Sequence, residues 1–473
     1  MFKNAMIRTG AVVSMCAMAA GCAVGPDYKP PEPELDPAFA GKVLVESTAG
    51  QSGQQWWKEF GDPLLDELVT EAQASNRNIA AAEARLKEAR ASRRDQNWGF
   101  WPSPTVQASA TSKRQSLGGT PGGVPVERNY DLYDAGFDAS WEIDLFGYKR
   151  GSQALKATRD VAIAARDDVR LSVVAEVARN YFELRGAQQQ LAVAERNAGN
   201  QRRALDLVQA RLDAGRGTAL DTARAEAQIE TTLSTVPPLE AAVARARHRI
   251  EVLVGKRPGQ LTERLGMVAP LPALPATIAM DDPASLLRRR PDLRVAERRL
   301  AATSALIGVA TADLFPRITL NGAIGVQALS LDGLGDSGND YRRFGPSLSW
   351  AFLDIGRVRQ RIKAAGARHE EAYANYEQTV LTALEDVENA LSDFAHERRR
   401  QEHLDAAARA SAMAADLATQ RFEGGIGDFL ATLDANRTAL DAEDLLAQSQ
   451  TAAATALVAL YKALGAGGET PAP

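Results

Sequence analysis

Four short segments of the chain alternate between apolar and polar side chains, the period expected of a β-strand with one apolar and one wet face. They lie around residues 106–111, 135–145, 318–327 and 344–352. Each predicted strand has about nine to eleven residues, the length that crosses a lipid bilayer when the strand is tilted. The pattern suits strands between lipid and water, and a soluble sheet packed against helices remains the alternative.

Apolar residues elsewhere recur at helical spacing and predict two very long helices, at about 153–212 and 358–422. At 1.5 Å per residue, each is roughly 90 to 100 Å long. In the first of them the spacing of three and four residues marks one packed stripe: Leu171, Val174, Ala178, Tyr181 and Leu184. A helix of this length needs its stripe covered along most of its length.

Shorter helices are predicted to provide that cover. Two opening helices span about 64–98 and 284–313, and two return helices span about 218–254 and 428–464. Each return helix is only about half as long as the long helix that precedes it. We therefore expect an opening helix to continue each return helix end to end. Pro237 and Pro238 are predicted to interrupt the first return helix, because proline breaks a helix interior.

The chain also matches itself at a shift near 210 residues, the sign of a tandem duplication. At a shift of 210, for example, Arg211, Gly215 and Gly217 fall on Arg421, Gly425 and Gly427. The predicted organisation is a leader at 1–21, an extended segment at 22–63, a first repeat at 64–258, a Pro-rich equatorial linker at 259–283, a second repeat at 284–465 and a tail at 466–473.

The N-terminus has the features of an export signal. Lys3 and Arg8 precede an apolar stretch at 10–20 that is too short to span a bilayer. The sequence Ala-Ala-Gly-Cys ending at Cys22 resembles the lipobox of bacterial lipoproteins, which implies lipidation of Cys22. Ala23, in place of aspartate, resembles a signal for sorting to the outer membrane. One acyl chain anchors weakly, so further membrane contact is expected.

Composition narrows the function. The 55 basic and 60 acidic residues give a net charge of −5, which argues against nucleic acid as a partner. Both cysteines fall within the first 22 residues, and the four histidines are scattered, so we expect no cofactor or metal site. His396 and His403 share a spacing that a metal would allow, but a solvated basic surface is the simpler interpretation. No phosphate loop, nucleophile motif or zinc-protease motif points to an enzyme.

The predicted strands imply more than one chain. A four-stranded sheet has two open edges, which lipid does not tolerate, and the smallest closed membrane barrels need about eight strands. Three chains would supply 4 × 3 = 12 strands and enclose a lumen, whereas two chains would close a barrel filled by side chains. The predicted fold class is therefore mainly α with a transmembrane β-barrel, built from a tandem repeat in a homotrimer.

Several stretches together resemble the TolC-like outer-membrane factors of tripartite efflux pumps, and among them the NodT-type lipoproteins. They are Cys22 with Gly25-Pro26-Asp27-Tyr28-Lys29-Pro30, Trp56-Trp57 with Phe60 and Asp62-Pro63-Leu64, residues 140–147, Arg288 to Asp292, and the turns at Gly215 and Gly425. The resemblance implies a trimer with a twelve-stranded barrel in the outer membrane of a Gram-negative cell and a long periplasmic helical tunnel. It also implies two partners, a periplasmic adaptor and an inner-membrane pump of the RND type. The rival interpretation is a soluble periplasmic coiled-coil scaffold or adaptor lipoprotein.

Two groups of residues follow from the resemblance as site candidates. The first is the adaptor-docking surface at the two helical turns: Arg211, Gly215, Gly217, Arg421, Gly425 and Gly427. The alternative is that these glycines only end helices and the arginines only complement helix carbonyls.

The second group is a periplasmic gate that opens like an iris. Leu430, Asp434 and Arg437 are spaced four and three apart and so share one helical face, which Asp441 continues. Three copies of Asp434 around an axis would favour cations, and Arg437 would tie neighbouring helices by a salt bridge that breaks on opening. The alternative is an ordinary solvated charged stripe. The first copy has Arg224 at the position of Asp434, with Asp221 nearby.

Overall fold

The computed structural model of the chain describes residues 24–48, 50, 53–99, 101–114 and 128–467. The chain divides into two compact units. The first combines residues 1–31, 86–161 and 296–376, and the second combines 32–85, 162–295 and 377–473. Among the described residues, no helix has both the length and the apolar character needed to cross a membrane.

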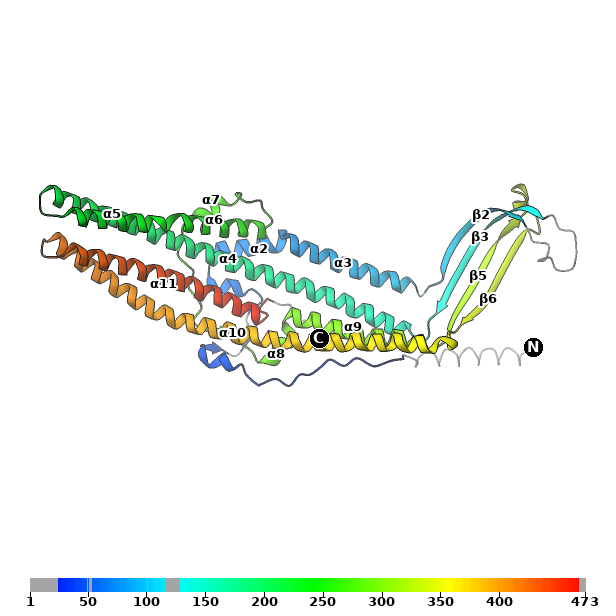
Figure 1. Cartoon of the computed structure of the whole chain (residues 1–473). Coiled ribbons are helices and arrows are strands. Elements are labelled where there is room, and N and C mark those ends of the chain that lie inside the picture. Colours follow the sequence, from blue (N-terminus) through cyan, green and yellow to red (C-terminus); the bar gives the residue numbers. More distant parts are fainter. Residues whose placement is uncertain (1–23, 49, 51–52, 100, 115–127, 468–473) are drawn as a thin grey trace. The chain divides into compact units, whose positions relative to one another are not determined.

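The first unit contains one antiparallel sheet in the order β2-β3-β5-β6 (Figure 1). Its strands are β2 (Ser103–Arg114), β3 (Asn129–Ile143), β5 (Arg317–Ala328) and β6 (Asp340–Ser349). The predicted strand lengths were too short for three of these, which have 12, 15 and 12 residues. The predicted end of the last strand was wrong, because Trp350 follows β6 and Phe352 starts the 3-10 helix η6 (Phe352–Asp354).

The register gives the sheet two different faces. Val106, Phe137 and Ile324 lie opposite one another on one face, which is mainly apolar. Ser109, Asp134 and Gln327 lie opposite one another on the other, which is mainly polar. Because side chains alternate along a strand, this register confirms the predicted alternation. Arg342, in register with Ile324, is a charged exception on the apolar face.

The two long helices are confirmed and are slightly longer than predicted. They are α4 (Tyr148–Asp213), with 66 residues, and α10 (Ile355–Glu423), with 69. In the second unit the predicted stripe of α4 is buried, and Tyr181 and Leu184 have no exposed surface. The helical spacing in the sequence therefore identified the packed face correctly.

The opening helices are each divided in two, so the prediction of single helices was wrong. The first consists of α2 (Pro63–Ser75) and α3 (Arg77–Trp98), and the second of α8 (Pro283–Arg289) and α9 (Pro291–Ala312). Both copies start with Asp-Pro, in which the aspartate caps the helix and proline takes its first position. The breaks fall at Asn76 and Arg290.

Each break lies against the end of the return helix of its own copy. In the first copy the return helix is α5 (Ala219–Ser234) and α6 (Val236–Leu253), divided at Thr235 as the two prolines predict. The Asn76 amide donates to the carbonyl of Leu253 over 2.7 Å. In the second copy the return helix α11 (Phe429–Ala463) is continuous, and Arg290 donates to the carbonyl of Ala463 over 3.3 Å.

Glycine makes both junctions possible. Gly255 and Gly465 follow the two return helices with φ of 75° and 67°. A Cβ on Gly255 would lie 2.6 Å from the Ser75 carbonyl oxygen, and one on Gly465 would lie 3.2 Å from the backbone nitrogen of Arg290. A side chain at either position would separate the helix ends. Each return helix therefore meets the opening helix of its own copy, a choice that the sequence left open.

Short elements complete the second unit. A parallel pair joins β1 (Ser47–Thr48) to β4 (Ile278–Ala279). The 3-10 helices η1 (Ala40–Leu44) and η2 (Trp56–Phe60) and the helix α7 (Thr262–Gly266) lie in the same unit. The ring of Trp56 in η2 stacks on Tyr461 in α11, with centroids 5.0 Å apart.

Candidate gate and docking site

Both helical hairpins turn through the same glycine geometry. Gly215 and Gly425 have φ of 70° and 79°, in the left-handed region that favours glycine. Two residues later, a Cβ on Gly217 would lie 2.9 Å from the Leu212 backbone nitrogen. One on Gly427 would lie 2.7 Å from the Phe422 nitrogen. All four glycines thus have a backbone role at the turns.

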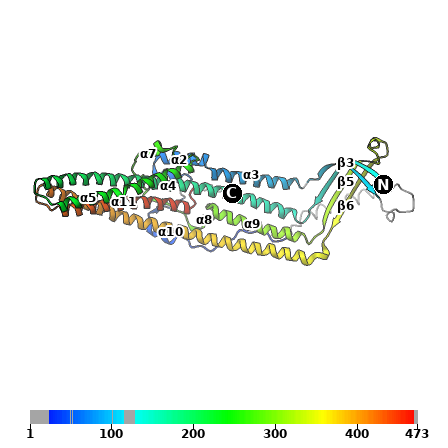
Figure 2. The same ribbon diagram turned by 45° about the horizontal axis from the view of Figure 1, so that its top comes forward.

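An apolar cluster joins the two hairpins behind their turns, and the hairpin ends lie side by side in both views (Figures 1 and 2). The cluster contains Val208, Ala225, Phe422 and Phe429, with Leu205, Leu207 and Leu433 at its edge. The guanidinium of Arg211 lies 3.9 Å from the centroid of the Phe422 ring and donates to the Phe422 carbonyl. Arg211 therefore ties one hairpin to the other, whereas Arg421 is exposed.

The turn glycines give a first prediction. Gly427→Ala is expected to distort the second turn, because the added carbon would lie too close to the backbone of Phe422. Gly424→Ala is the matched control, because its nearest neighbour would be 3.4 Å away. Hydrogen exchange of the peptide around residues 420–430 should rise in Gly427→Ala only. Equal exchange in the two variants would mean that the turn tolerates a side chain at Gly427.

The candidate gate residues lie on the first turns of α11. Asp434 and Arg437 form an ion pair of 3.2 Å, and both side chains are more than half exposed. Leu430 is 47% exposed. The ion pair of Arg437 is made within α11, so the expected bond to a neighbouring helix is not present among the described residues of this chain. A surface pair of this kind contributes little to stability and leaves both groups available for other roles.

The acidic face of α11 extends beyond the predicted residues. Burial raises the pKa of Asp444, and the charge of Asp441 raises it further, against a hydrogen bond donated by Gln448. Asp441 was expected to continue the stripe, but Asp444 was missed. The sequence could have indicated Asp444, because it follows Asp441 by three residues and that spacing places two carboxylates on one face of a helix.

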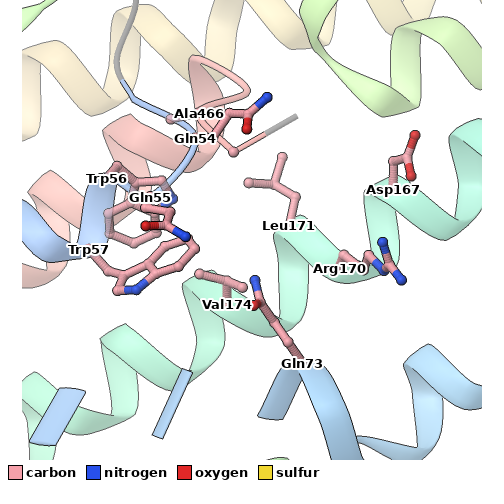
Figure 3. A pocket seen from close by; sticks show the side chains of 11 residues that line it. Gln54, Gln55, Trp56, Trp57, Gln73, Asp167, Arg170, Leu171, Val174 and Ala466 are labelled. Carbon is pink, nitrogen blue, oxygen red and sulfur yellow. The ribbon is translucent and has the colours of Figure 1, made fainter. Parts of the chain in front are cut away.

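A cavity of about 290 Å³ lies in the second unit (Figure 3). Trp56 and Trp57 line one side and Asp167 and Arg170 the other, with Leu171 between them. The charged groups already have partners: Arg170 pairs with Glu83 at 2.8 Å, and Asp167 pairs with Arg166 and Arg294. The charged side chains of this cavity are therefore already engaged with other residues.

Lipidation and metal binding concern residues away from the hairpin turns. Cys22, the predicted lipidation site, lies outside the described residues. Across the described part of the chain, no group of three or more histidine, cysteine, aspartate or glutamate side chains is arranged to hold a metal ion.

Comparison with known proteins identifies the family. The family model described as outer membrane efflux protein matches residues 68–256 and 283–466. The chain belongs to this family. The two matched segments follow the duplication, since each contains one long helix and one return helix.

Individual relatives agree with this assignment. Nodulation protein T of Rhizobium leguminosarum bv. trifolii is 31% identical over 452 residues, 95% of each chain. The pyoverdine export outer membrane protein OpmQ of Pseudomonas putida is 33% identical over 427 residues, 89% of each chain. The solved structure of the outer-membrane channel OprN is 41% identical with a TM-score of 0.88, covering 95% of this chain and 100% of that one. This outer membrane efflux protein is therefore a TolC-like transport channel of the outer membrane.

Proposed function

We propose that this outer membrane efflux protein is the exit channel of a tripartite system and works as a homotrimer. The observation that carries the proposal is the two-faced sheet of the first unit. Its outermost strands β2 and β6 each have one neighbour among the described strands. Lipid does not tolerate an open sheet edge, so pairing β2 of one chain with β6 of the next would close a barrel. Three chains would give twelve strands with the polar faces around a lumen.

The hairpin turns are proposed to dock a periplasmic adaptor, which would connect the channel to an inner-membrane pump of the RND type. Support comes from the exposure of Arg421 and Gly425 and from the buried apolar cluster behind the turns. Arg211 has a narrower role in this proposal. Because it is engaged with Phe422, it would hold the two turns together and leave direct docking to the exposed residues.

The proposed gate is a ring of Asp434 and Arg437 from three chains, with Leu430 one turn away. Its support is the exposure of the pair and its position next to the cluster residue Leu433. Three aspartates near one axis would attract cations, and Arg437 would offset their mutual repulsion in the closed state. No catalytic step is proposed, because a channel acts through geometry and electrostatics. Lipidation of Cys22 would supply the second membrane attachment.

Paired substitutions in β5 test the channel against a soluble scaffold. Leu320 lies on the apolar face and its neighbour Asn321 on the polar face. Arginine facing lipid costs up to about 2–4 kcal/mol at the bilayer midplane, whereas arginine facing a lumen is tolerated. Leu320→Arg is therefore expected to deplete the protein from the outer-membrane fraction, and Asn321→Arg is expected to leave it there.

The purified native protein and the two arginine variants also test whether the chain assembles into a trimeric channel. Detergent-solubilised native protein is expected to have the mass of three chains and to conduct ions in planar bilayers. Extraction by salt without detergent, together with equal behaviour of the two arginine variants, would favour the scaffold instead.

A further inference from the structure

A buried arginine of α4 holds the segment Gly25-Pro26-Asp27-Tyr28 within the first unit. Arg150, in the first turn of α4, has a side chain only 3% exposed. Its guanidinium donates to the carbonyls of Val24 and Gly25 over 2.8 and 2.9 Å and pairs with Asp27 at 2.9 Å. Within its own helix it donates to Gln153 over 3.0 Å. We call residues 24–31 the strap.

Arg150 and the strap depend on each other. A buried guanidinium needs acceptors for its donors, and the N-terminal end of a helix is an unfavourable place for a positive charge. Most of the hydrogen bonds that compensate Arg150 come from the strap. Asp27 itself is 87% exposed, so the two backbone carbonyls supply the more shielded contacts.

Two glycines allow the strap to approach the helices closely. Gly25 has φ of 87°, and a Cβ built on it would lie 2.5 Å from the Cα of Gly308 in α9. A Cβ on Gly308 would lie 2.8 Å from the Val24 carbonyl oxygen and 2.5 Å from Cγ of Arg150. A side chain on Gly308 would therefore occupy the place of the strap.

A second contact holds the strap at Tyr28. The hydroxyl of Tyr28 donates to the Glu297 carboxylate of α9 over 2.5 Å. Pro26, Asp27 and Tyr28 line a cavity of about 420 Å³ together with one face of α4 and one face of α9. The strap thus lies in a groove between two helices that adjoin the sheet in sequence: β3 ends five residues before α4, and β5 begins five residues after α9.

We propose that Arg150, Gly308 and Glu297 form a clamp that fixes the point at which the acylated N-terminus leaves the first unit. The inference rests on the proposed lipidation of Cys22. Cys22 precedes Val24 by two residues in the sequence. The clamp would hold the acyl chains beside the helices that enter the sheet and keep both membrane attachments at one level. Arg150 acts here as a positioning residue.

A nitroxide at residue 24 tests the clamp in the full-length, acylated protein in lipid vesicles. Val24→Cys supplies the thiol, because Cys16 lies in the leader and an acylated Cys22 has none. The label is expected to be immobilised and to show a single depth near the lipid headgroups. Adding Arg150→Ala is expected to remove the immobilised component. Arg159→Ala is the matched control, because Arg159 lies on α4 and pairs with the adjacent Asp160.

Gly308→Ala provides an independent variant if Arg150→Ala fails to fold. Alanine favours a helix more than glycine does, so α9 should form while the strap is displaced. Labels that stay immobilised in both Arg150→Ala and Gly308→Ala, or a residue-24 label remote from the membrane, would overturn the proposal. Palmitate incorporation, lost in Cys22→Ala, reports on lipidation separately. A failure of acylation would appear as labelled thiols beyond the one at residue 24, because Cys22 would keep its thiol, and this distinguishes it from failure of the clamp.

Discussion

Removing the ion pair between Asp434 and Arg437 is expected to raise the single-channel conductance of the purified protein in planar bilayers several-fold. The double variant Asp434→Ala with Arg437→Ala deletes both charges of the proposed ring and leaves the helix intact, because alanine is a good helix former. Both side chains are more than half exposed, so the fold does not depend on them. The expected change is therefore in the channel and not in the amount of folded trimer.

A second exposed ion pair supplies the control for this measurement. Asp405 and Arg409 pair on α10 as residues i and i+4, with side chains 45% and 71% exposed. Their double alanine variant should conduct like the native protein. Conductance that is unchanged in the Asp434–Arg437 variant, or raised equally in both, would remove these residues from the gate. Asp434→Asn alone should also lower the preference for cations, and high salt should mask that difference.

Replacing Arg290 with alanine is expected to lower the free energy of unfolding of the second unit by about 2–3 kcal/mol. Arg290 has a side chain 9% exposed and pairs with Asp292 and Asp386 at 2.7 and 2.9 Å. It also donates to the carbonyls of Ala383 and Ala463. The variant would leave the end of α11 without this donor and two carboxylates without their cation.

Chemical unfolding followed by tryptophan fluorescence measures this effect, because Trp56 stacks on Tyr461 near the end of α11. Arg288→Ala is the matched control: Arg288 is exposed on α8, the short helix that ends just before Arg290, and its loss should change stability by less than about 0.5 kcal/mol. If the two variants unfold at the same denaturant concentration, the junction does not depend on Arg290.

The predictable parts of this protein were those with a strong local period. The stripe through Tyr181 and Leu184 identified the packed face of α4, and the alternation around Phe137 identified the apolar face of the sheet. Pro237 and Pro238 marked the break between α5 and α6, because proline lacks the amide that a helix interior needs.

The break at Arg290 has the same kind of local mark, because Pro291 follows it and proline disfavours a helical conformation in the residue before it. The break at Asn76 has no proline beside it. The side-chain oxygen of Asn76 caps α3 by accepting from the amides of Asn78 and Ile79. Its side-chain nitrogen donates to the carbonyl of Leu253, which is 177 residues away in sequence. The distant carbonyl could not be identified from the sequence. The partner of Arg211 was equally hidden, since Phe422 belongs to the other hairpin. Contacts of this kind depend on how segments that are distant in sequence pack together. They leave no periodic pattern in the sequence from which they could be predicted.

The sequence by itself determined the duplication, the two long helices, the two-faced strands and the glycines of the turns, because each depends on side-chain periodicity or on backbone freedom at one position. Only the tertiary structure decided which opening helix meets which return helix, that Arg437 pairs within its own helix, and that Arg150 holds the strap. The physical reason is that hydrogen bonds and ion pairs join groups at the ends of long side chains. Their partners are known only when the backbone has placed both residues.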